Sequence, residues 1–474
     1  MSFKPLWELR AAFAKSLSTM YGSEVPAYNT LVDVSTQVNK EFLAVHGAAA
    51  ERLGTISRVT AERHGAIRVG SEREMSQVAR VFAAFGMHPV GFYDLRDASS
   101  SAVPVVSTAF RPIDSEELAK NPFRVFTSML AGEDPRFFDD ELQAELRAFL
   151  DKRELFGQEL LELADRSASE GGLDEESAQR LLALATAAFE LSGEPVNHQW
   201  YRRLEAISAV AADIGGVGST HINHLTPRVL DIDDLYRRME ALGIEMIDEI
   251  QGPPRWDGPD VLLRQTSFRA LGEDRMFLHP DGSIKPGNLR VRFGEVEARG
   301  IALTPAGRDL YDRMVAETDR RLKSQPGAKR TDVARGVWEE NLPRTEKELA
   351  EQGLAYFTFR LERDALAATK LAATVKLSEL IAQGIAVPEP IVYEDFLPRS
   401  AAGIFQSNLT EQGSKDEARD GTNYDIDRMS EIVGNTVIDP NVLYQEQQDL
   451  SVAGLARELG IHIVSDAAAL DAAR

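Results

Sequence analysis

The chain has 474 residues, more than one hydrophobic core usually holds, and its 43% hydrophobic and 27% charged residues are typical of a globular protein of two or three units. A formal net charge of −22 argues against binding to nucleic acid or to an anionic membrane, and the absence of cysteine excludes disulfides, thiolate nucleophiles and cysteine-bound metals. No secretion signal opens the chain and no apolar run reaches the ~20 residues of a membrane span, so we expect a soluble, cytoplasmic protein.

The first 130 residues divide into a helical region and a mixed unit. Residues 1–63 are predicted to be N-terminal helices, and residues 64–130 a βαβββ unit. The helix of this unit is expected over 72–85, beginning at the capping-box sequence Ser71–Glu74 and ending at Gly86. Its strands are expected near residues 64–69, 89–95, 103–112 and 123–130.

The remainder of the chain alternates in the same way. Residues 131–218 are predicted to be a helical insertion, because apolar residues recur at spacings of three and four. Residues 219–304 repeat the βαβββ order and end in a strand near 289–297. Residues 305–474 form a mainly helical C-terminal region that contains a compact loop and strand at 391–412.

The two mixed units repeat one another in sequence. His64 and His224 each open a β-like run, and a helix N-cap follows seven residues later in both, at Ser71 and Asp231. Two similar segments, T-A-F-R and T-S-F-R, follow at residues 108–111 and 266–269. The pattern predicts an α+β protein in which paired βαβββ units form a central curved sheet with large helical insertions. A histidine at the same place in each unit predicts a metal site between the two halves.

His64 and His224 are the predicted metal ligands among eight histidines, because they occupy matching positions in the repeat. His221 is a competing candidate. In a regular strand, residues three apart point to opposite faces, so His221 and His224 cannot both enter one pocket unless a bulge intervenes. We choose His224, which keeps the repeat register, and expect His221 to lie on the surface or beside the ligands.

A carboxylate ligand is expected from the segment F-G-E-V-E-A-R-G, residues 293–300. Glu295 and Glu297 would share one face of a strand, so that one binds the metal while the other pairs with an arginine such as Arg299. The pattern leaves open which glutamate is the ligand. Two histidines and one carboxylate are the ligand set of non-haem Fe(II) oxygenases, and catalytic Zn²⁺ uses the same set.

Two further features favour anion binding. Arg68 lies four residues after His64 on the same predicted strand face, and a guanidinium binds a carboxylate through two parallel hydrogen bonds. The segment at residues 395–403 has small residues after a proline and would offer backbone N–H groups to an anion, although local evidence favours an ordinary turn.

These residues lie within longer motifs that resemble the 2-oxoadipate dioxygenase/decarboxylase family, whose members are also called hydroxyglutarate synthases. The resemblance covers about residues 5–410. It rests on the motifs H-G-A-I-R-V-G, S-T-A-F-R, P-F-R-V-F-T-S, H-I-N-H-L-T-P-R, L-L-R-Q-T-S-F, F-G-E-V-E-x-R-G-x-A-L-T and Y-E-D-F-L-P-x-S-A-A-G-I-F-Q-S-N-L. The fold of this family is related to the vicinal oxygen chelate superfamily, which is built from paired βαβββ units, in agreement with the internal repeat.

The resemblance implies Fe(II) as the cofactor, bound by His64, His224 and Glu295, and so selects Glu295 over Glu297. The implied reaction is 2-oxoadipate + O₂ → 2-hydroxyglutarate + CO₂, a late step of lysine catabolism. The partners of the protein are then a small 2-oxo dicarboxylate and O₂, with neither nucleic acid nor membrane.

The resemblance also implies the substrate contacts. Arg68 would bind the 2-oxo acid, and the backbone of Arg399 and Ser400 would contact a substrate carboxylate. The family pattern has a small apolar residue where Arg399 stands, a departure that a backbone contact tolerates. Two alternatives remain on the sequence alone: a Zn²⁺- or Ni²⁺-dependent lyase or isomerase acting on a 2-oxo acid, and a non-catalytic dicarboxylate-binding protein.

Overall fold

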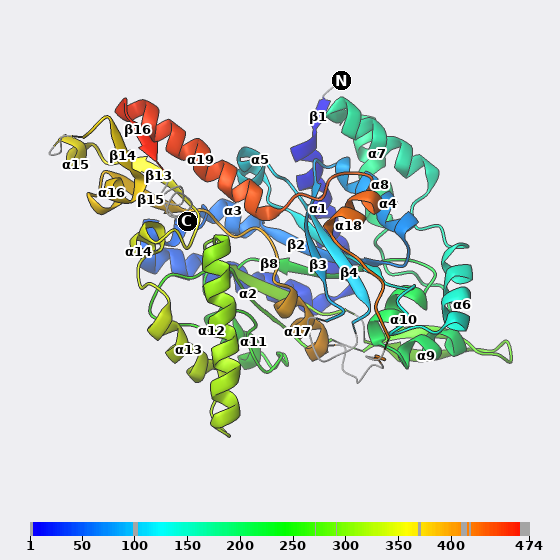
Figure 1. Cartoon of the computed structure of the whole chain (residues 1–474). Coiled ribbons are helices and arrows are strands. Elements are labelled where there is room, and N and C mark those ends of the chain that lie inside the picture. Colours follow the sequence, from blue (N-terminus) through cyan, green and yellow to red (C-terminus); the bar gives the residue numbers. More distant parts are fainter. Residues whose placement is uncertain are drawn as a thin grey trace.

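A computed structural model of the chain describes residues 3–97, 103–270, 272–290, 292–367, 371–408, 415–416 and 419–464. Figure 1 shows a group of central strands with helices around them, and most of residues 305–390 gathered on one side. The N-terminal region is helical, as predicted. Its elements are β1 (Phe3–Pro5), α1 (Leu6–Glu24), α2 (Pro26–His46), the 3-10 helix η1 (Gly47–Glu51) and α3 (Ile56–Ala61).

The first mixed unit has its strands within two residues of the predicted positions. Its elements are β2 (Arg63–Val69), α4 (Glu72–Ala83), β3 (His88–Asp94), β4 (Val105–Arg111), α5 (Ser115–Lys120) and β5 (Arg124–Leu130). The predicted capping box is only half formed. The Ser71 hydroxyl accepts from the N–H of Glu74, but the Glu74 carboxylate accepts from Gly70 and from Arg153 instead. Glu74 therefore ties the start of α4 to the helical insertion.

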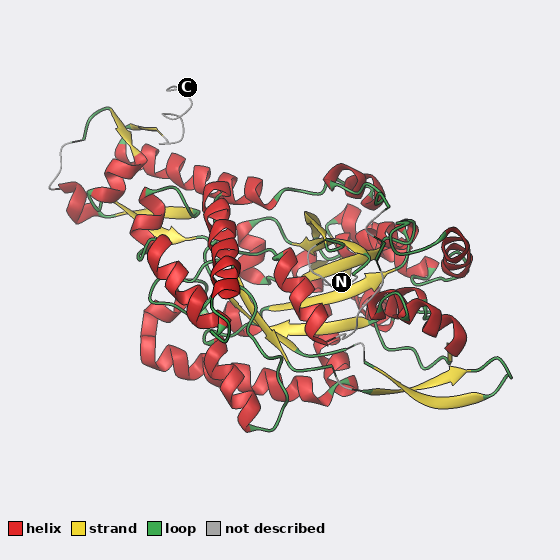
Figure 2. Cartoon of the chain, turned by 60° about the horizontal axis from the view of Figure 1, so that its bottom comes forward, coloured by secondary structure: helices red, strands yellow, loops and turns green. Residues whose placement is uncertain are grey.

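The second mixed unit begins at β8 and has the same order, except that a further strand stands where the first unit has helix α5. Its elements are β8 (Ile222–Pro227), α11 (Ile232–Ala241), β9 (Leu263–Ser267), β10 (Glu273–Leu278), β11 (Ile284–Leu289) and β12 (Glu295–Arg299). The predicted final strand at 289–297 is wrong, because that segment holds the end of the β10–β11 hairpin, a connection and the start of β12. The hairpin extends away from the sheet in Figure 2.

The two units join through their first strands. Strands are hydrogen-bonded in the order β3-β4-β5-β2-β8, and β2 and β8 are antiparallel. β12 pairs antiparallel with β9 and is linked to the end of β8 by a single parallel bridge, Arg228 to Glu297. The five strands β3, β4, β5, β2 and β8 therefore form one continuous hydrogen-bonded sheet. The remaining strands of the second unit are linked to it only through the bridge between β8 and β12.

The helical insertion and the C-terminal region surround this sheet (Figure 1). The insertion contains α6 (Asp140–Leu150), α7 (Gln158–Glu170), β6 (Gly172–Asp174), α8 (Glu175–Ala187), β7 (Val196–Asn197), α9 (His198–Glu205) and α10 (Ala209–Gly215). The C-terminal region contains α12 (Pro305–Ser324), α13 (Arg330–Asn341), α14 (Glu346–Glu351), β13 (Phe357–Leu361), α15 (Arg363–Ala367), β14 (Thr374–Lys376), α16 (Leu377–Ala382), β15 (Ala386–Pro390), α17 (Pro398–Asn408), α18 (Ile426–Val433), α19 (Pro440–Leu459) and β16 (His462–Val464).

The prediction of a loop and strand at 391–412 is wrong. Residues 398–408 form helix α17, which begins at the proline that the sequence interpretation placed in a turn, and residues 409–412 lie outside the described part of the chain. Proline suits the first turn of a helix, because its missing N–H would have no partner there. Within the residues that the structure describes, no helix is long and apolar enough to cross a membrane.

Both faces of the sheet are covered, and this decides where polar side chains of β2 point. Ile67 and Val69 enter one hydrophobic core, whereas Ala66 enters another. Because side chains alternate along a strand, His64 and Arg68 share the face of Ala66. That face is the one on which the predicted site lies.

Candidate metal centre

His64, His224 and Glu295 come together from β2, β8 and β12. One ligand atom of each residue lies within 4.8 Å of the other two, and all three side chains are buried. Nε2 of His64 is 3.3 Å from Oε1 of Glu295, and Nε2 of His224 is 3.7 Å from Oε2 of the same carboxylate. The two imidazole rings are nearly perpendicular, at 86°. The three predicted ligands thus converge on one point, each through an atom that can bind a metal.

The strand pairing explains this convergence. β2 and β8 are antiparallel neighbours in which Ala66 faces His224, so His64 and His224 lie diagonally across one ladder. Glu295 is the first residue of β12, the strand that is bridged to the end of β8. His64 and His224 therefore meet because the two repeated units pair through their first strands, and Glu295 joins them through the bridge between Arg228 and Glu297.

Each of these side chains is held by a second residue. Oε2 of Glu297 is 2.8 Å from Nδ1 of His64, and the hydroxyl of Thr226 is 3.0 Å from Nδ1 of His224. Nε2 of Gln265 donates a hydrogen bond of 2.6 Å to Glu295. Contacts to Nδ1 direct Nε2 of both rings toward the carboxylate, the usual arrangement around metal-binding histidines. Sequence reasoning missed Thr226 and Gln265. Thr226 could have been predicted, because residues two apart on a strand point to the same face and Thr226 lies two residues after His224.

Glu297 is bound to arginine, as predicted for the second glutamate. It accepts hydrogen bonds of 2.7 and 2.9 Å from Arg299, and Arg124 lies 3.4 Å away. Burial raises the pKa of the Glu297 carboxyl, but Arg299, His64 and Arg124 together outweigh burial and lower that pKa to about 2. Glu297 is therefore ionised at neutral pH and presents a negative charge to His64.

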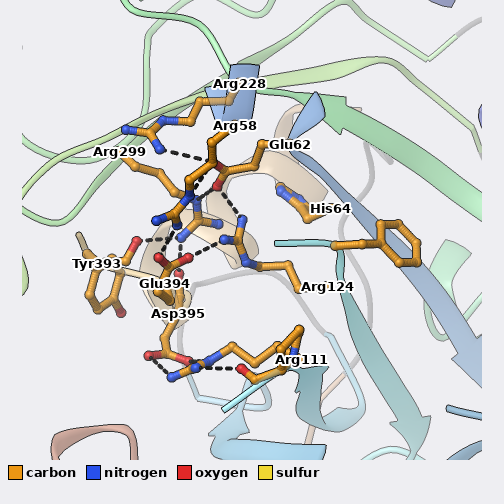
Figure 3. Close-up of polar contacts among 12 residues, drawn as sticks. Arg58, Glu62, His64, Arg111, Arg124, Arg228, Arg299, Tyr393, Glu394 and Asp395 are labelled. Atoms are coloured by element: carbon orange, nitrogen blue, oxygen red, sulfur yellow. Dashed lines mark hydrogen bonds and ion pairs between the residues drawn. The ribbon is translucent and has the colours of Figure 1, made fainter. Parts of the chain in front are cut away.

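A larger cluster of buried charges, absent from the sequence predictions, surrounds Glu297. Figure 3 shows its arginines and glutamates pointing toward one another beside His64. Its further members are Glu62, Glu394, Arg58 and Arg228. The Glu62 carboxylate forms ion pairs with Arg124 at 2.8 Å and with Arg228 at 2.9 Å. Glu394 pairs with Arg58 and Arg124. Burial raises the pKa of Glu62, but Arg228 and Arg124 hold it well below its usual value.

The pKa values of the two candidate histidine ligands shift in opposite directions. Burial lowers the pKa of His224 to about 4, which its neighbour Glu295 only partly offsets, so His224 is neutral at pH 7. Burial also lowers the pKa of His64, but Glu297 and Glu295 outweigh it and the net shift is upward. The carboxylates thus favour a cation at the Nε2 side of His64, either a proton or a metal ion.

His221 is buried and not on the surface, because the bulge that the alternation argument left open does occur. The register between β2 and β8 shifts, so that Ala66 faces His224 while Ile67 faces Ile222, with Asn223 as an extra residue. This bulge returns His221 to the side of the sheet on which His224 lies. His221 nevertheless stays outside the three-residue group and contacts Asn223 at 3.1 Å and Asp213 at 3.4 Å.

Arg68 lies on the same strand face as His64, as predicted. Its side chain is buried, and its Nη1 pairs with Oδ2 of Asp213 on α10. In the sheet register Arg68 stands beside Ser128, whose hydroxyl is 2.8 Å from that of Ser107. Sequence reasoning missed Asp213, which no local pattern connects to β2.

Arg399 and Ser400 lie in the first turn of α17. The Arg399 side chain is exposed and donates to Asp319 at 2.7 Å, whereas Ser400 is buried. Phe396, just before this helix, packs its ring 5.0 Å from that of His64. The unusual side chain at 399 therefore faces solvent and Asp319, and the backbone N–H groups of the first turn remain suited to an anion.

The fold and site define an α+β protein with an enclosed group of two histidines and one carboxylate, the donor set of mononuclear metalloenzymes. Residues 13–408 match the model of the family described as 2-oxoadipate dioxygenase/decarboxylase. The chain therefore belongs to the 2-oxoadipate dioxygenase/decarboxylase family of enzymes, which confirms the resemblance.

Relatives named 2-oxoadipate dioxygenase/decarboxylase extend over nearly the whole chain. The protein from Mycobacterium tuberculosis is 55% identical over 437 residues, which are 92% of this chain and 95% of the relative. The protein from Pseudomonas putida is 40% identical over 96% of this chain and 97% of its own. The crystal structure of the hydroxyglutarate synthase from Pseudomonas putida in complex with 2-oxoadipate superposes with a TM-score of 0.81 at 37% identity, covering 97% of this chain and all of that one.

Proposed function

We propose that the protein is an Fe(II)-dependent dioxygenase that converts 2-oxoadipate and O₂ to 2-hydroxyglutarate and CO₂. The observation that carries the proposal is the convergence of His64, His224 and Glu295 in a buried site. The names of the relatives, and the 2-oxoadipate bound in the Pseudomonas putida structure, support the choice of substrate.

The residues present fit Fe(II). Two imidazole nitrogens and one carboxylate form a ligand set with one negative charge, and such a set leaves positions open for a chelating substrate and for O₂. The contacts of Nδ1 to Glu297 and Thr226 support this fit, because they orient both Nε2 atoms toward the carboxylate. When bound, Fe(II) would supply the redox chemistry with O₂.

The protein would bind and orient the acid. Arg68, buried beside the centre, would bind one substrate carboxylate, and the backbone N–H groups of Arg399 and Ser400 would bind another. The ring of Phe396 lies against His64 and would help to exclude water. The reaction balances if the acid loses its first carboxyl group as CO₂ and retains both atoms of O₂, one in the new carboxylate and one in the hydroxyl.

The proposal is tested by loading purified protein anaerobically with Fe(II) and then adding 2-oxoadipate and oxygenated buffer. We expect O₂ uptake, CO₂ release and 2-hydroxyglutarate formation in equal amounts, and none of these from metal-free protein. The absence of O₂ uptake with Fe(II) would overturn the dioxygenase. Turnover with Zn²⁺ or Ni²⁺ and without O₂ would identify a lyase or isomerase, and binding without turnover would identify a binding protein.

A further inference from the structure

Asp213 is a buried carboxylate next to the candidate centre but outside its ligand group. It lies on α10, is 4% exposed, and pairs through Oδ2 with Nη1 of Arg68. Arg68 in turn lies on the strand face of His64, and its charge acts on the pKa of His224. Asp213 therefore contacts the arginine to which the proposed function assigns a substrate carboxylate.

Asn223, in the bulged part of β8, holds Asp213 in place, and His221, just before β8, lies beside it. Asn223, the extra residue of the bulge, donates to Oδ2 at 3.0 Å, and His221 lies 3.4 Å from Oδ1. The bulge itself is fixed from the other side, because the hydroxyl of Tyr21 donates to the backbone carbonyl of Asn223 at 3.0 Å. Bulges of this kind redirect side chains beside active sites. Here the bulge directs two polar side chains at one carboxylate.

Stability alone does not account for this arrangement. Removing a carboxylate and a guanidinium from water costs free energy that their pairing only partly returns, and well-packed apolar residues of the same size are often as stable. Nor is Asp213 placed to act as a competitor that leaves Arg68 when a substrate arrives. Its helix is buried along its length, and Oδ2 of its carboxylate accepts a hydrogen bond from Asn223 of β8. A carboxylate that is fixed on a buried helix and paired with the arginine fits an orienting role.

We propose that Asp213, held by Asn223, is a positioning residue that fixes the guanidinium of Arg68 in the orientation that binds a carboxylate of the 2-oxo acid. This inference rests on the proposed function, since it deepens the role of Arg68 in the same site. A fixed guanidinium binds a carboxylate more tightly than a mobile one, because less conformational entropy is lost on binding.

The test compares Asp213→Asn with the matched control Asp134→Asn. Asp134 is also fully buried and paired with an arginine, Arg96 at 2.8 Å, but it is not part of the site. We expect Asp213→Asn to raise both KM and the anaerobic Kd for 2-oxoadipate by about tenfold or more, with kcat changed less than about threefold and the iron content unchanged. Asp134→Asn should leave KM unchanged. An unchanged KM in Asp213→Asn would show that Asp213 has only a structural role. A lower KM would show that Asp213 competes with the substrate for Arg68. Either result overturns the inference.

A double-mutant cycle separates orientation from general damage. In an Arg68→Ala background, Asp213→Asn should produce no further rise in KM, because the residue through which it acts is gone. Additive effects would overturn the inference. If Asp213→Asn does not fold, Asn223→Ala tests the same support, with a severalfold rise in KM expected and an unchanged KM contradicting it. Failure of the wild-type enzyme to bind 2-oxoadipate would overturn the proposed function itself, and with it this role of Asp213.

Discussion

His64 lies between two glutamates, one at each ring nitrogen, and this arrangement distinguishes it from an ordinary buried histidine. Glu295 faces Nε2 at 3.3 Å and Glu297 faces Nδ1 at 2.8 Å. Because Arg299 and Arg124 keep Glu297 ionised, its charge favours the tautomer with hydrogen on Nδ1 and an available lone pair on Nε2. The two acids of the E-x-E sequence thus have different tasks, one toward the metal position and one toward the ring.

Glu297→Gln tests this division. The amide keeps the size of the side chain but loses the charge that orients His64, so we expect metal affinity to fall about 10- to 100-fold. A competition titration with a metal chelator measures it. Glu74→Gln is the matched control, since Glu74 is equally buried and paired with an arginine, Arg153, but belongs to no contact of the three ligands, and metal affinity should not change. Equal metal affinity in Glu297→Gln and the wild type would contradict the assignment.

The ligand assignment itself is tested by His64→Ala, His224→Ala and Glu295→Ala. Each removes one of three ligands, so we expect iron retention and activity to be lost while circular dichroism shows an intact fold. His221→Ala is the control, because His221 is as buried as His224 and only three residues away. It should keep its iron. Loss of iron in His221→Ala but not in His224→Ala would show that the wrong histidine was chosen.

At the scale of elements, the C-terminal helix α19 supports the segment that leads into the site. The hydroxyl of Tyr444 donates to Asp395 and accepts from the N–H of Glu394 at 2.7 Å. Asp395 is also held by Arg111 at 2.8 and 3.0 Å, and the next residue, Phe396, packs on His64. The family match ends at residue 408, so a helix beyond it helps to position α17 and the ring beside the metal centre.

Tyr444→Phe removes this hydroxyl and leaves a buried carboxylate and a buried N–H each without one partner. We expect the free energy of unfolding to fall by about 1–3 kcal/mol, measured by denaturant titration. Tyr356→Phe is the control, because the Tyr356 ring packs against Tyr444 but its hydroxyl takes no part in the Asp395 contacts. Equal stability of Tyr444→Phe and the wild type would show that α19 does not support this segment.

At the scale of the whole molecule, the buried charge cluster of Figure 3 connects regions that are distant in sequence. Glu62 follows α3, Arg124 begins β5, Arg228 follows β8, and Glu394 belongs to the C-terminal region. Each arginine reaches a carboxylate from another region, so the cluster ties the N-terminal helices, both repeated units and the C-terminal region together around His64. A buried charge without its partner is strongly destabilising, so the cluster depends on every region being in place.

This cluster predicts a loss of stability in acid. Burial alone raises the pKa of Glu62, but the arginines hold it well below the ordinary 4.5, and that of Glu297 is about 2. Native carboxyls with lowered pKa values bind fewer protons than the unfolded chain, so their stabilisation is complete above pH 4.5 and declines as pH falls toward 2.

We therefore expect the free energy of unfolding of the metal-free protein to fall steadily below pH 4.5. Glu62→Gln should be much less stable than the wild type at pH 7, and the difference should shrink as the pH is lowered, since the wild-type carboxyl then becomes protonated as well. Urea titrations across this range measure it. A difference that stays constant with pH would contradict the lowered pKa of Glu62.

What the sequence determined by itself is local or repeated. The strands of the first unit and the ends of its helix follow from apolar alternation, the N-cap at Ser71 and the stop at Gly86, all of which act over a few residues. His64 and His224 were identified because the repeat places them at equivalent positions. The choice of Glu295 over Glu297 came from the family resemblance, since alternation alone puts both on one face.

Only the tertiary structure decided the rest. One extra residue at Asn223 reversed the direction expected for His221, and a bulge depends on the partner strand and on Tyr21, more than 200 residues away. Asp213 and Gln265 reach the site from α10 and β9, and no periodic pattern in the sequence predicts either contact. The arginine–glutamate cluster likewise arises from residues between 58 and 394. Local physics sets where elements begin and which face they bury, whereas partners across the molecule exist only once the units have packed together.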